Sequence, residues 1–381
     1  MKQIAAMLCA CLLLLCATAC NRIQADDDAV KQAKADLAAG EAALEAGNYT
    51  EAYARLSAYL SVCDNLDVAN LRDKLVFVPI TEENHHSNGS VHHTTYTYTK
   101  VGNLLETNVN YGEKQRTTQY TYDEKDRLIK KQESGDNVTY TYTYDEKDNC
   151  IARQVEIDGS ITNFTYTYDE QGNCLTTKQV DADGSTFLTT NRYDENSNKT
   201  YEKVDYADGT WQEQIYTYTP DGKLLTESGS GSVGDSYENT YTYNEAGLLV
   251  KKATAGGVYT YAYDEEGRLI QSVEPDGITL SYTYDANGNR LSEKISNADG
   301  EWGTTYTYDE HGNMLTLQHG NGEKRAFTYD ENGNKATETY ISMSGNVTTW
   351  QFKWELRYYP NGVPEDVEHI RSSAMAVQPV M

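Results

Sequence analysis

Residues 142–150 read Tyr142-Thr143-Tyr144-Asp145-Glu146-Lys147-Asp148-Asn149-Cys150, and this stretch decides the fold. Tyrosine and threonine alternate with a period of two residues, so both rings face one side of a strand and the threonine faces the other. The acidic and amide residues that follow favour a turn, because Asp stabilises the start of a turn with its side chain and Gly or Asn accepts a positive φ. The next residue then begins a return strand.

The same unit recurs from residue 94 to residue 360, and its second aromatic residue returns every 20 to 29 residues, which gives twelve copies. The copies are Tyr96-Thr97-Tyr98, Tyr120-Thr121-Tyr122, Tyr142-Thr143-Tyr144, Tyr166-Thr167-Tyr168, Arg192-Tyr193, Tyr216-Thr217-Tyr218, Tyr241-Thr242-Tyr243, Tyr261-Ala262-Tyr263, Tyr282-Thr283-Tyr284, Tyr306-Thr307-Tyr308, Phe327-Thr328-Tyr329 and a degenerate Arg357-Tyr358-Tyr359-Pro360-Asn361-Gly362. A second turn often reads Asp-Gly, as at Asp158-Gly159, which is a strong hairpin signal. Twelve units of two strands predict an antiparallel meander of roughly 24 strands.

The array resembles the Rhs/YD-repeat family of bacteria, which has relatives in animal teneurins. The resemblance covers about 265 residues, or roughly 70% of the chain. It implies a continuous β-spiral, which long arrays close into a hollow shell and from which some members release a toxin. Twelve copies are few for a shell, so we expect an open or partly curled sheet. No Asp-Pro self-cleavage motif follows Tyr359, and the tail, residues 363–381, is too short for a toxin domain. A remnant of a toxin-type protein is therefore only an alternative.

The N-terminus has the features of an export signal in residues 1–20. Lys2 provides a positive charge, and the apolar run from Ile4 to Cys16 is too short to span a bilayer. Ala17-Thr18-Ala19-Cys20 resembles a bacterial lipobox, in which Cys20 would be diacylated and residues 21–27 would form a tether. The resemblance implies an extracytoplasmic protein anchored to the bacterial membrane by lipid. The same Ala-x-Ala pattern also fits ordinary cleavage, which would give a secreted protein.

Residues 28–78 have helical character. Val30, Ala33, Leu37 and Leu44 recur at helical spacing. Gly47 breaks the run, Asn48 with Glu51 predicts a capped second helix, and a third helix is expected from about Asn65 to Lys74. The pattern resembles one tetratricopeptide-type unit. A single unit makes no peptide groove, so a capping or spacer hairpin is the first interpretation and partner docking the second.

Cysteines are few in the mature chain, which would keep Cys63, Cys150 and Cys174. They do not form a disulfide framework. Cys150 and Cys174 occupy equivalent points of consecutive repeats, about 9–10 Å apart. A disulfide needs Cα atoms closer than about 7 Å, so we expect free thiols.

Residues 79–93 form a His-rich connecting hairpin before the array at 94–362. Asn88-Gly89 predicts a two-residue turn that would set His85 opposite His92, with His86 and His93 nearby. Paired imidazoles can bind zinc, nickel or copper, and Glu82 and Glu83 lie close by. The alternative is an exposed polar hairpin without metal.

Two further site hypotheses concern the repeats. The Asp-Glu-x-Gly-Asn turns partly mimic a calcium loop but lack its 12-residue spacing and closing Glu, so any calcium binding would be weak and distributed. The tyrosine rows either stabilise the sheet as cross-strand ladders or stack on sugar rings. The candidate stacking residues are Tyr166, Tyr168, Tyr216, Tyr218, Tyr282, Tyr284, Tyr306 and Tyr308.

Charge and composition restrict the function. The 381-residue chain carries a net charge of −26, which makes nucleic acid a poor partner. The chain has 32 Tyr and only 5 Phe, which predicts a thin sheet whose faces are partly exposed to water, because tyrosine buries its ring and keeps its hydroxyl hydrated or hydrogen-bonded. No phosphate loop, nucleophile elbow or Cys–His pair appears, so we expect no enzyme and no required cofactor. The leading hypothesis is surface binding or adhesion to a glycan or protein. The others are a structural spacer without a small ligand and an extracytoplasmic metal binder at the histidines.

Overall fold

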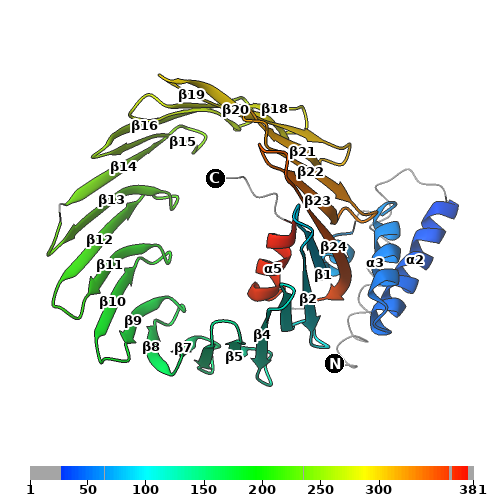
Figure 1. Ribbon diagram of the computed structural model, residues 1–381, viewed down its shortest axis with the longest axis horizontal. Helices are drawn as coiled ribbons and strands as arrows, with labels where there is room; N and C mark the ends of the chain where they lie inside the picture. The colour runs from blue at the N-terminus through cyan, green and yellow to red at the C-terminus, as the bar shows by residue number, and fades with distance from the viewer. Residues whose placement is uncertain (1–26, 64, 235, 360–362, 376–381) are drawn as a thin grey trace.

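The computed structural model describes residues 27–63, 65–234, 236–359 and 363–375. Residues 1–26, which include the expected signal segment, Cys20 and most of the tether, lie outside this range. The described chain forms 24 antiparallel strands, three helices before them and one helix after them (Figure 1). The predicted strand number is therefore confirmed.

The strands follow the chain in order. They are β1 (Leu75–His85), β2 (Val91–Tyr98), β3 (Leu104–Asn110), β4 (Gln115–Tyr122), β5 (Leu128–Glu133), β6 (Val138–Tyr144), β7 (Cys150–Ile157), β8 (Ser160–Tyr168), β9 (Cys174–Val180), β10 (Thr186–Tyr193), β11 (Lys199–Asp205), β12 (Trp211–Tyr218), β13 (Leu224–Gly231), β14 (Tyr237–Tyr243), β15 (Leu249–Thr254), β16 (Gly257–Tyr263), β17 (Leu269–Val273), β18 (Thr279–Tyr284), β19 (Arg290–Asn297), β20 (Gly300–Tyr308), β21 (Met314–His319), β22 (Lys324–Tyr329), β23 (Lys335–Ile341) and β24 (Val347–Tyr358).

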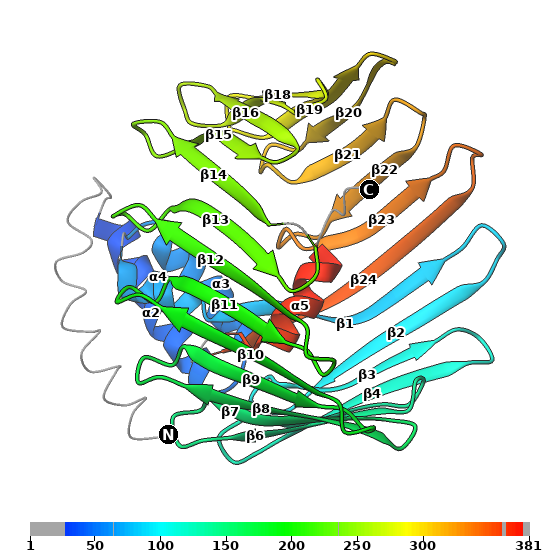
Figure 2. The same cartoon turned by 90° about the vertical axis from the view of Figure 1, so that its left-hand side faces the viewer.

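The sheet closes on itself. Each strand pairs with the next, and β24 pairs with β1 from Leu75 opposite Tyr358 to His85 opposite Thr349. The strands therefore form a closed barrel, seen from the side in Figure 2, and the expectation of an open or partly curled sheet is wrong. Closure removes both unpaired edges, each of which would expose a row of backbone N–H and C=O groups. Closure could not be predicted from the repeats, because β1 begins at Leu75 and carries no tyrosine motif.

The last repeat is displaced from its predicted position. Phe352 pairs with Glu82 and Trp354 with Pro79, just as Tyr96 pairs with Thr107 and Tyr98 with Leu104. Phe352-Lys353-Trp354 is therefore the twelfth aromatic–x–aromatic unit, in place of Arg357-Tyr358-Tyr359. Trp354 follows Tyr329 by 25 residues (354 − 329), a spacing within the range of the other copies.

The first eleven repeats carry the same bulge and the same turn. The register shifts by one residue beside the second aromatic residue, so that the residue after the first return-strand position is extra, as Ile151 is between Cys150 and Ala152. The turn of that repeat is closed by Asp148 N–H donating to the Asp145 carbonyl at 3.3 Å. Asp145 Oδ1 accepts the backbone N–H groups of Lys147 and Asn149 at 2.8 and 2.9 Å. The turn residues therefore act as predicted.

A tyrosine latch joins successive repeats. In the first eleven units the second tyrosine donates its hydroxyl to a backbone carbonyl of the preceding strand, as Tyr168 does to Cys150 O at 2.7 Å. The acceptor is the first residue of that strand in every case but Tyr98, which donates to Pro79 O inside β1. Eleven tyrosines make this bond: Tyr98, Tyr122, Tyr144, Tyr168, Tyr193, Tyr218, Tyr243, Tyr263, Tyr284, Tyr308 and Tyr329. Trp354 replaces the tyrosine in the twelfth unit, where its Nε1 donates to Lys335 O at 2.8 Å.

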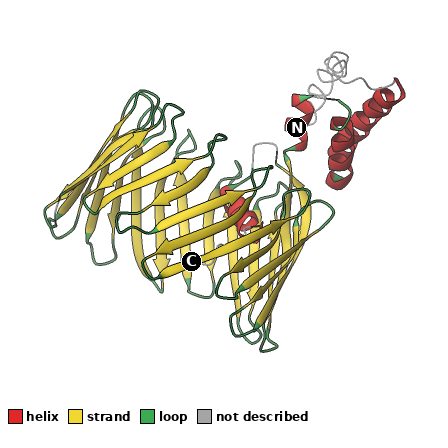
Figure 3. Cartoon of the chain, turned by 90° about the horizontal axis from the view of Figure 1, so that it is seen from above, coloured by secondary structure: helices red, strands yellow, loops and turns green. Residues whose placement is uncertain are grey.

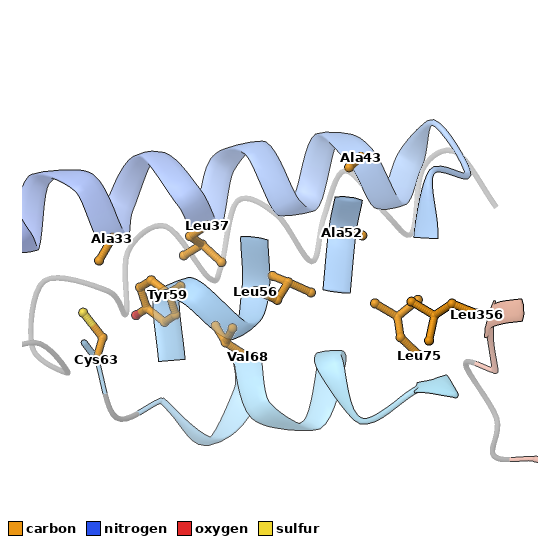
Figure 4. Packing of buried hydrophobic residues seen from close by; sticks show 10 residues of the cluster. All are labelled: Ala33, Leu37, Ala43, Ala52, Leu56, Tyr59, Cys63, Val68, Leu75 and Leu356. Carbon is orange, nitrogen blue, oxygen red and sulfur yellow. The ribbon is translucent and has the colours of Figure 1, made fainter. Parts of the chain in front are cut away.

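The helical module contains α2 (Asp27–Glu45), α3 (Tyr49–Leu60) and α4 (Leu66–Arg72) and lies outside the barrel (Figure 3). The predicted cap at Asn48 is confirmed, since its side chain accepts from Glu51 N–H at 3.4 Å. Asn65 caps α4 in the same way and accepts from Val68 N–H at 3.2 Å. A Cβ at Gly40 would lie 3.0 Å from Leu56, so glycine permits the close approach of α2 and α3. Figure 4 shows the buried core, which continues into the barrel through Leu75 and Leu356.

Two cysteines are free, as expected, and one is not. Cys150 and Cys174 are free thiols on neighbouring repeats. Cys63 lies in the buried core of the helical module and is disulfide-bonded. The expectation of free thiols, which was made for Cys150 and Cys174, is therefore confirmed.

The last helix, α5 (Glu365–Met375), lies inside the ring of strands (Figure 1). Val367 is fully buried and shares an apolar cluster with Val78 and Leu104, against which Ile370, Tyr96, Tyr98 and Tyr120 also pack. Ala374 is 5% exposed. Residues 367, 370 and 374 are spaced so that they form one apolar stripe on a helix. This helical pattern is present in the sequence, but the segment 363–381 was interpreted only as a short tail.

Candidate functional site

The tyrosines face the interior of the barrel. Tyr96, Tyr98 and Tyr120 belong to the apolar cluster that holds α5, and α5 lies inside the ring. Because side chains alternate along a strand, the threonines between the tyrosines face outward and are exposed. Several pair across strands, as Thr167 and Thr176 do with hydroxyls 2.6 Å apart. The interior wall is therefore aromatic, whereas the outer wall carries threonines together with exposed apolar residues such as Ile161 and Ile215.

The predicted stacking residues all lie on this inner wall and are half-buried. Tyr168, Tyr218, Tyr284 and Tyr308 are second tyrosines, whose hydroxyls are held by the latch. The first tyrosines of these units lie two residues further from the turn and are Tyr166, Tyr216, Tyr282 and Tyr306. Burial raises the pKa of the Tyr168 and Tyr216 hydroxyls to about 12. The rings of Tyr168 and Tyr216 are thus presented to the interior as neutral phenols.

A pocket of about 950 Å³ lies between α5 and the wall formed by β4 to β6. Its wall side holds the rings of Tyr120, Tyr122, Tyr142 and Tyr144. Polar groups come from Lys131 and Asp126 on the wall and from Glu368, His369 and Ser372 on α5. The volume lies in the range of small-molecule sites, which combine apolar walls with a few convergent polar groups.

A second pocket of about 440 Å³ lies on another side of α5 and contains a buried ionic cluster. Lys335 Nζ lies 2.8 Å from Glu338 Oε2, and Arg325 pairs with the other oxygen of Glu338. Burial raises the pKa of Glu82, whose carboxylate accepts the Tyr96 hydroxyl at 3.4 Å. Trp350 and Phe352 complete the wall. His369 and Ile370 line both pockets, so α5 separates them.

Sequence reasoning missed these pocket residues for two reasons. Trp350 and Phe352 belong to the displaced twelfth repeat, where the Tyr–Asp motif is absent. The residues of α5 reach the pockets because α5, which follows the array, packs against strands at its beginning, as Val367 does against Val78 and Leu104. An aromatic–x–aromatic search tolerant of Trp and Phe would have found Phe352 and Trp354.

The histidine hairpin differs by one residue from its predicted register. His86 N–H donates to Ser90 O at 2.9 Å and Gly89, at φ +82°, ends a three-residue loop, so Asn84 pairs with His92 in place of His85. The reason is that this hairpin uses the same turn as the repeats, a type I turn followed by a left-handed glycine.

The four histidines consequently form two pairs on opposite faces. His86 Nε2 and His92 Nδ1 are 3.1 Å apart, whereas His85 Nε2 and His93 Nδ1 lie 3.4 and 3.5 Å from the carboxylate of Glu83. Within the described part of the chain, no group of three or more His, Cys, Asp or Glu side chains is arranged to hold a metal ion. Zinc at this hairpin stays a prediction.

The turn aspartates are occupied by their own turns. In Asp145 one oxygen accepts two backbone N–H groups, and the other accepts the Asn149 amide at 2.9 Å. The hydrogen bond from Asn149 holds the pKa of this carboxyl below its usual value. A calcium ion at this turn would therefore compete with hydrogen-bond donors that already occupy both oxygens of Asp145.

The expected lipid-bearing Cys20 lies outside the described residues. Of the helices that the structure describes, none combines the length and the apolar character that crossing a bilayer requires.

Comparison with known proteins supports the nature of the repeats. Residues 243–279 and 263–301 match a family model described as RHS Repeat. This segment carries RHS repeats. The matches run from the end of β14 into β20, through hairpins of the kind described above. No curated protein matches the chain in sequence.

Three solved structures are similar to this chain. The crystal structure of TcdB2-TccC3-Cdc42 is 13% identical with a TM-score of 0.41, over 73% of this chain and 18% of that one. TcdB2-TccC3-TEV is 12% identical with a TM-score of 0.33, over 66% and 18%. A porin-like protein from Bacteroides uniformis is 14% identical with a TM-score of 0.22, over 73% and 98%. The chain thus spans about a fifth of the length of the first two.

Proposed function

We propose that this RHS-repeat barrel is a non-catalytic, lipid-anchored cell-envelope protein that binds glycan in its interior. The observation that carries the proposal is the larger pocket, where four tyrosine rings of two neighbouring repeats face α5. Rings with adjacent charged and hydroxyl groups suit sugars, which present one apolar face and a rim of hydroxyls. The volume of about 950 Å³ is sufficient for an oligosaccharide end.

Binding without chemistry agrees with the polar groups of this pocket. A nucleophile needs a base within hydrogen-bond reach that is itself oriented by a third group. Ser372 donates to Glu368 Oε1 at 3.0 Å, and the same carboxylate is paired with Arg371, so this hydroxyl is committed within α5. We therefore infer that Ser372 does not act as a nucleophile, and we propose that the pocket groups position a ligand.

The test is a glycan array and a peptidoglycan pull-down with residues 21–381. Tyr142→Ala removes a pocket ring, and Tyr261→Ala is its matched control, the same repeat position in another unit but outside the pocket. We expect saturable binding that Tyr142→Ala weakens at least tenfold and Tyr261→Ala leaves within twofold. Absence of binding across all ligands would contradict the proposal and favour a spacer or scaffold.

The anchor is tested separately. Cells that express the full chain are fractionated and compared with cells that express Cys20→Ser. We expect the native protein in the membrane fraction and the variant in the soluble fraction, because acylation needs the cysteine thiol. Equal partitioning of the two proteins would favour the secreted alternative.

A further inference from the structure

The contact between α5 and the barrel is narrow. It consists of the stripe Val367, Ile370 and Ala374, of which Val367 and Ala374 are buried. Every hydrogen bond or ion pair found for the described side chains of α5 stays within the helix, as between Arg371 and Glu368 at 3.0 Å. Arg371 Nε is buried without a partner among the described residues. No polar group of those side chains therefore ties α5 to the wall.

The helix is also short. An isolated helix of 11 residues is marginal in water, because nucleation costs more than so few hydrogen bonds return. Its order therefore depends on the docked stripe. Elements held by few apolar contacts are the ones that open first under native conditions.

The position of α5 determines which surfaces would be exposed if this helix undocked. His369 and Ile370 line both the 950 Å³ pocket and the 440 Å³ pocket. When α5 leaves, the tyrosine wall of the first pocket and the charged wall of the second, with Lys335 and Glu338, face one shared space. A ligand then meets rings and a buried ionic cluster together.

We propose that α5 docks reversibly inside the barrel through its apolar stripe, and that the two pockets become one space when it undocks. The inference goes beyond the proposed function and rests on it only for the nature of the natural ligand. Docking itself is measured without a glycan, so failure of one proposal is distinguishable from failure of the other.

The experiment uses the full mature chain and the variant Val367→Asp, which places a charge in the stripe. Met375→Asp is the matched control, since it adds the same charge to an exposed position outside both pockets. Hydrogen exchange of residues 368–375 and the fluorescence of anilinonaphthalene sulfonate are recorded. For Val367→Asp we expect exchange at least about tenfold faster and a several-fold fluorescence increase. For Met375→Asp we expect the native values.

Two additions guard against simple misfolding. The milder Val367→Ala is expected to give intermediate exchange with an unchanged circular dichroism spectrum. A synthetic peptide of residues 363–375, added to Val367→Asp, is expected to refill the site and reverse the fluorescence increase. Native protection of α5 in Val367→Asp, equal loss in Met375→Asp, or no effect of the peptide would each overturn the proposal.

Discussion

The hydroxyl of Tyr359 donates a hydrogen bond to the carbonyl oxygen of Gly102 at 2.9 Å, although 257 residues separate the two. Tyr359 is 2% exposed, and its ring lies where a side chain on residue 102 would stand: a Cβ there would be 2.7 Å from Tyr359 Cε1. Arg357 adds a hydrogen bond to Thr99 O at 3.2 Å in the same region. These contacts fasten the end of the array to its beginning.

Gly102→Ala is expected to destabilise the barrel more than Gly209→Ala. Both glycines have a left-handed φ, +96° and +83°, so each variant pays about 1–2 kcal/mol of backbone strain. Only Gly102 faces a ring, and overpacking adds about 1–3 kcal/mol. Urea unfolding of the two variants measures the difference. Equal losses would mean that the Tyr359 contact does not contribute to closure.

Tyr168→Phe is expected to cost about 1 kcal/mol, because it removes one latch and leaves Cys150 O without that donor. Tyr166→Phe is the matched control in the same strand, since its hydroxyl makes no hydrogen bond found among the described residues, and it is expected to change stability by less than about 0.5 kcal/mol. Denaturant unfolding compares them. A control that loses as much as the latch variant would assign the effect to burial of the hydroxyl.

Alkaline pH is expected to open the barrel. Burial raises the pKa of Tyr144, Tyr168 and Tyr329 to about 12, above the usual value for tyrosine. The folded state therefore holds protons that the unfolded state releases. The resulting stability is complete below about pH 10 and is lost as the pH rises toward about 12. Melting temperature and tyrosinate absorbance, followed together, should change in the same interval; a constant melting temperature through that interval would argue against the latches.

Acid is expected to weaken the turns. Hydrogen bonds from Asn149, Asn173 and Asn289 lower the pKa of Asp145, Asp169 and Asp285. Their contribution is present above the usual Asp pKa of about 4 and is lost as the pH falls through the lowered values. Melting curves recorded at falling pH test this. Replacing the three aspartates by Asn, the residue that stands at this position as Asn244, should reduce the acid dependence.

Glu338→Gln is expected to cost about 3–5 kcal/mol, because Lys335, with a side chain 3% exposed, would lose its buried counter-charge. Glu301→Gln breaks the exposed pair with Lys294 and should cost less than about 1 kcal/mol. Thermal unfolding separates the two. A small loss for Glu338→Gln would mean that Glu82 compensates the cluster.

Some features of the candidate site followed from the sequence and others did not. The alternation in Tyr166-Thr167-Tyr168 was sufficient to place both rings on one face, since the strand period is fixed by backbone geometry. It did not say that this face points inward. That choice was decided by the direction in which the closed sheet curves and by α5, which lies inside it.

The sequence by itself determined the repeat: two strands, and turns in which Asp148 or a glycine takes a left-handed φ. These are local features, set by neighbours within a few residues. Only the tertiary structure decided closure through β1 and β24, the displaced twelfth unit at Phe352 and Trp354, and the position of α5. Each depends on contacts between residues more than 250 positions apart, on which a local period places no constraint. The twelve copies predicted how many strands would form, and pairing of the two free edges decided that they form a barrel.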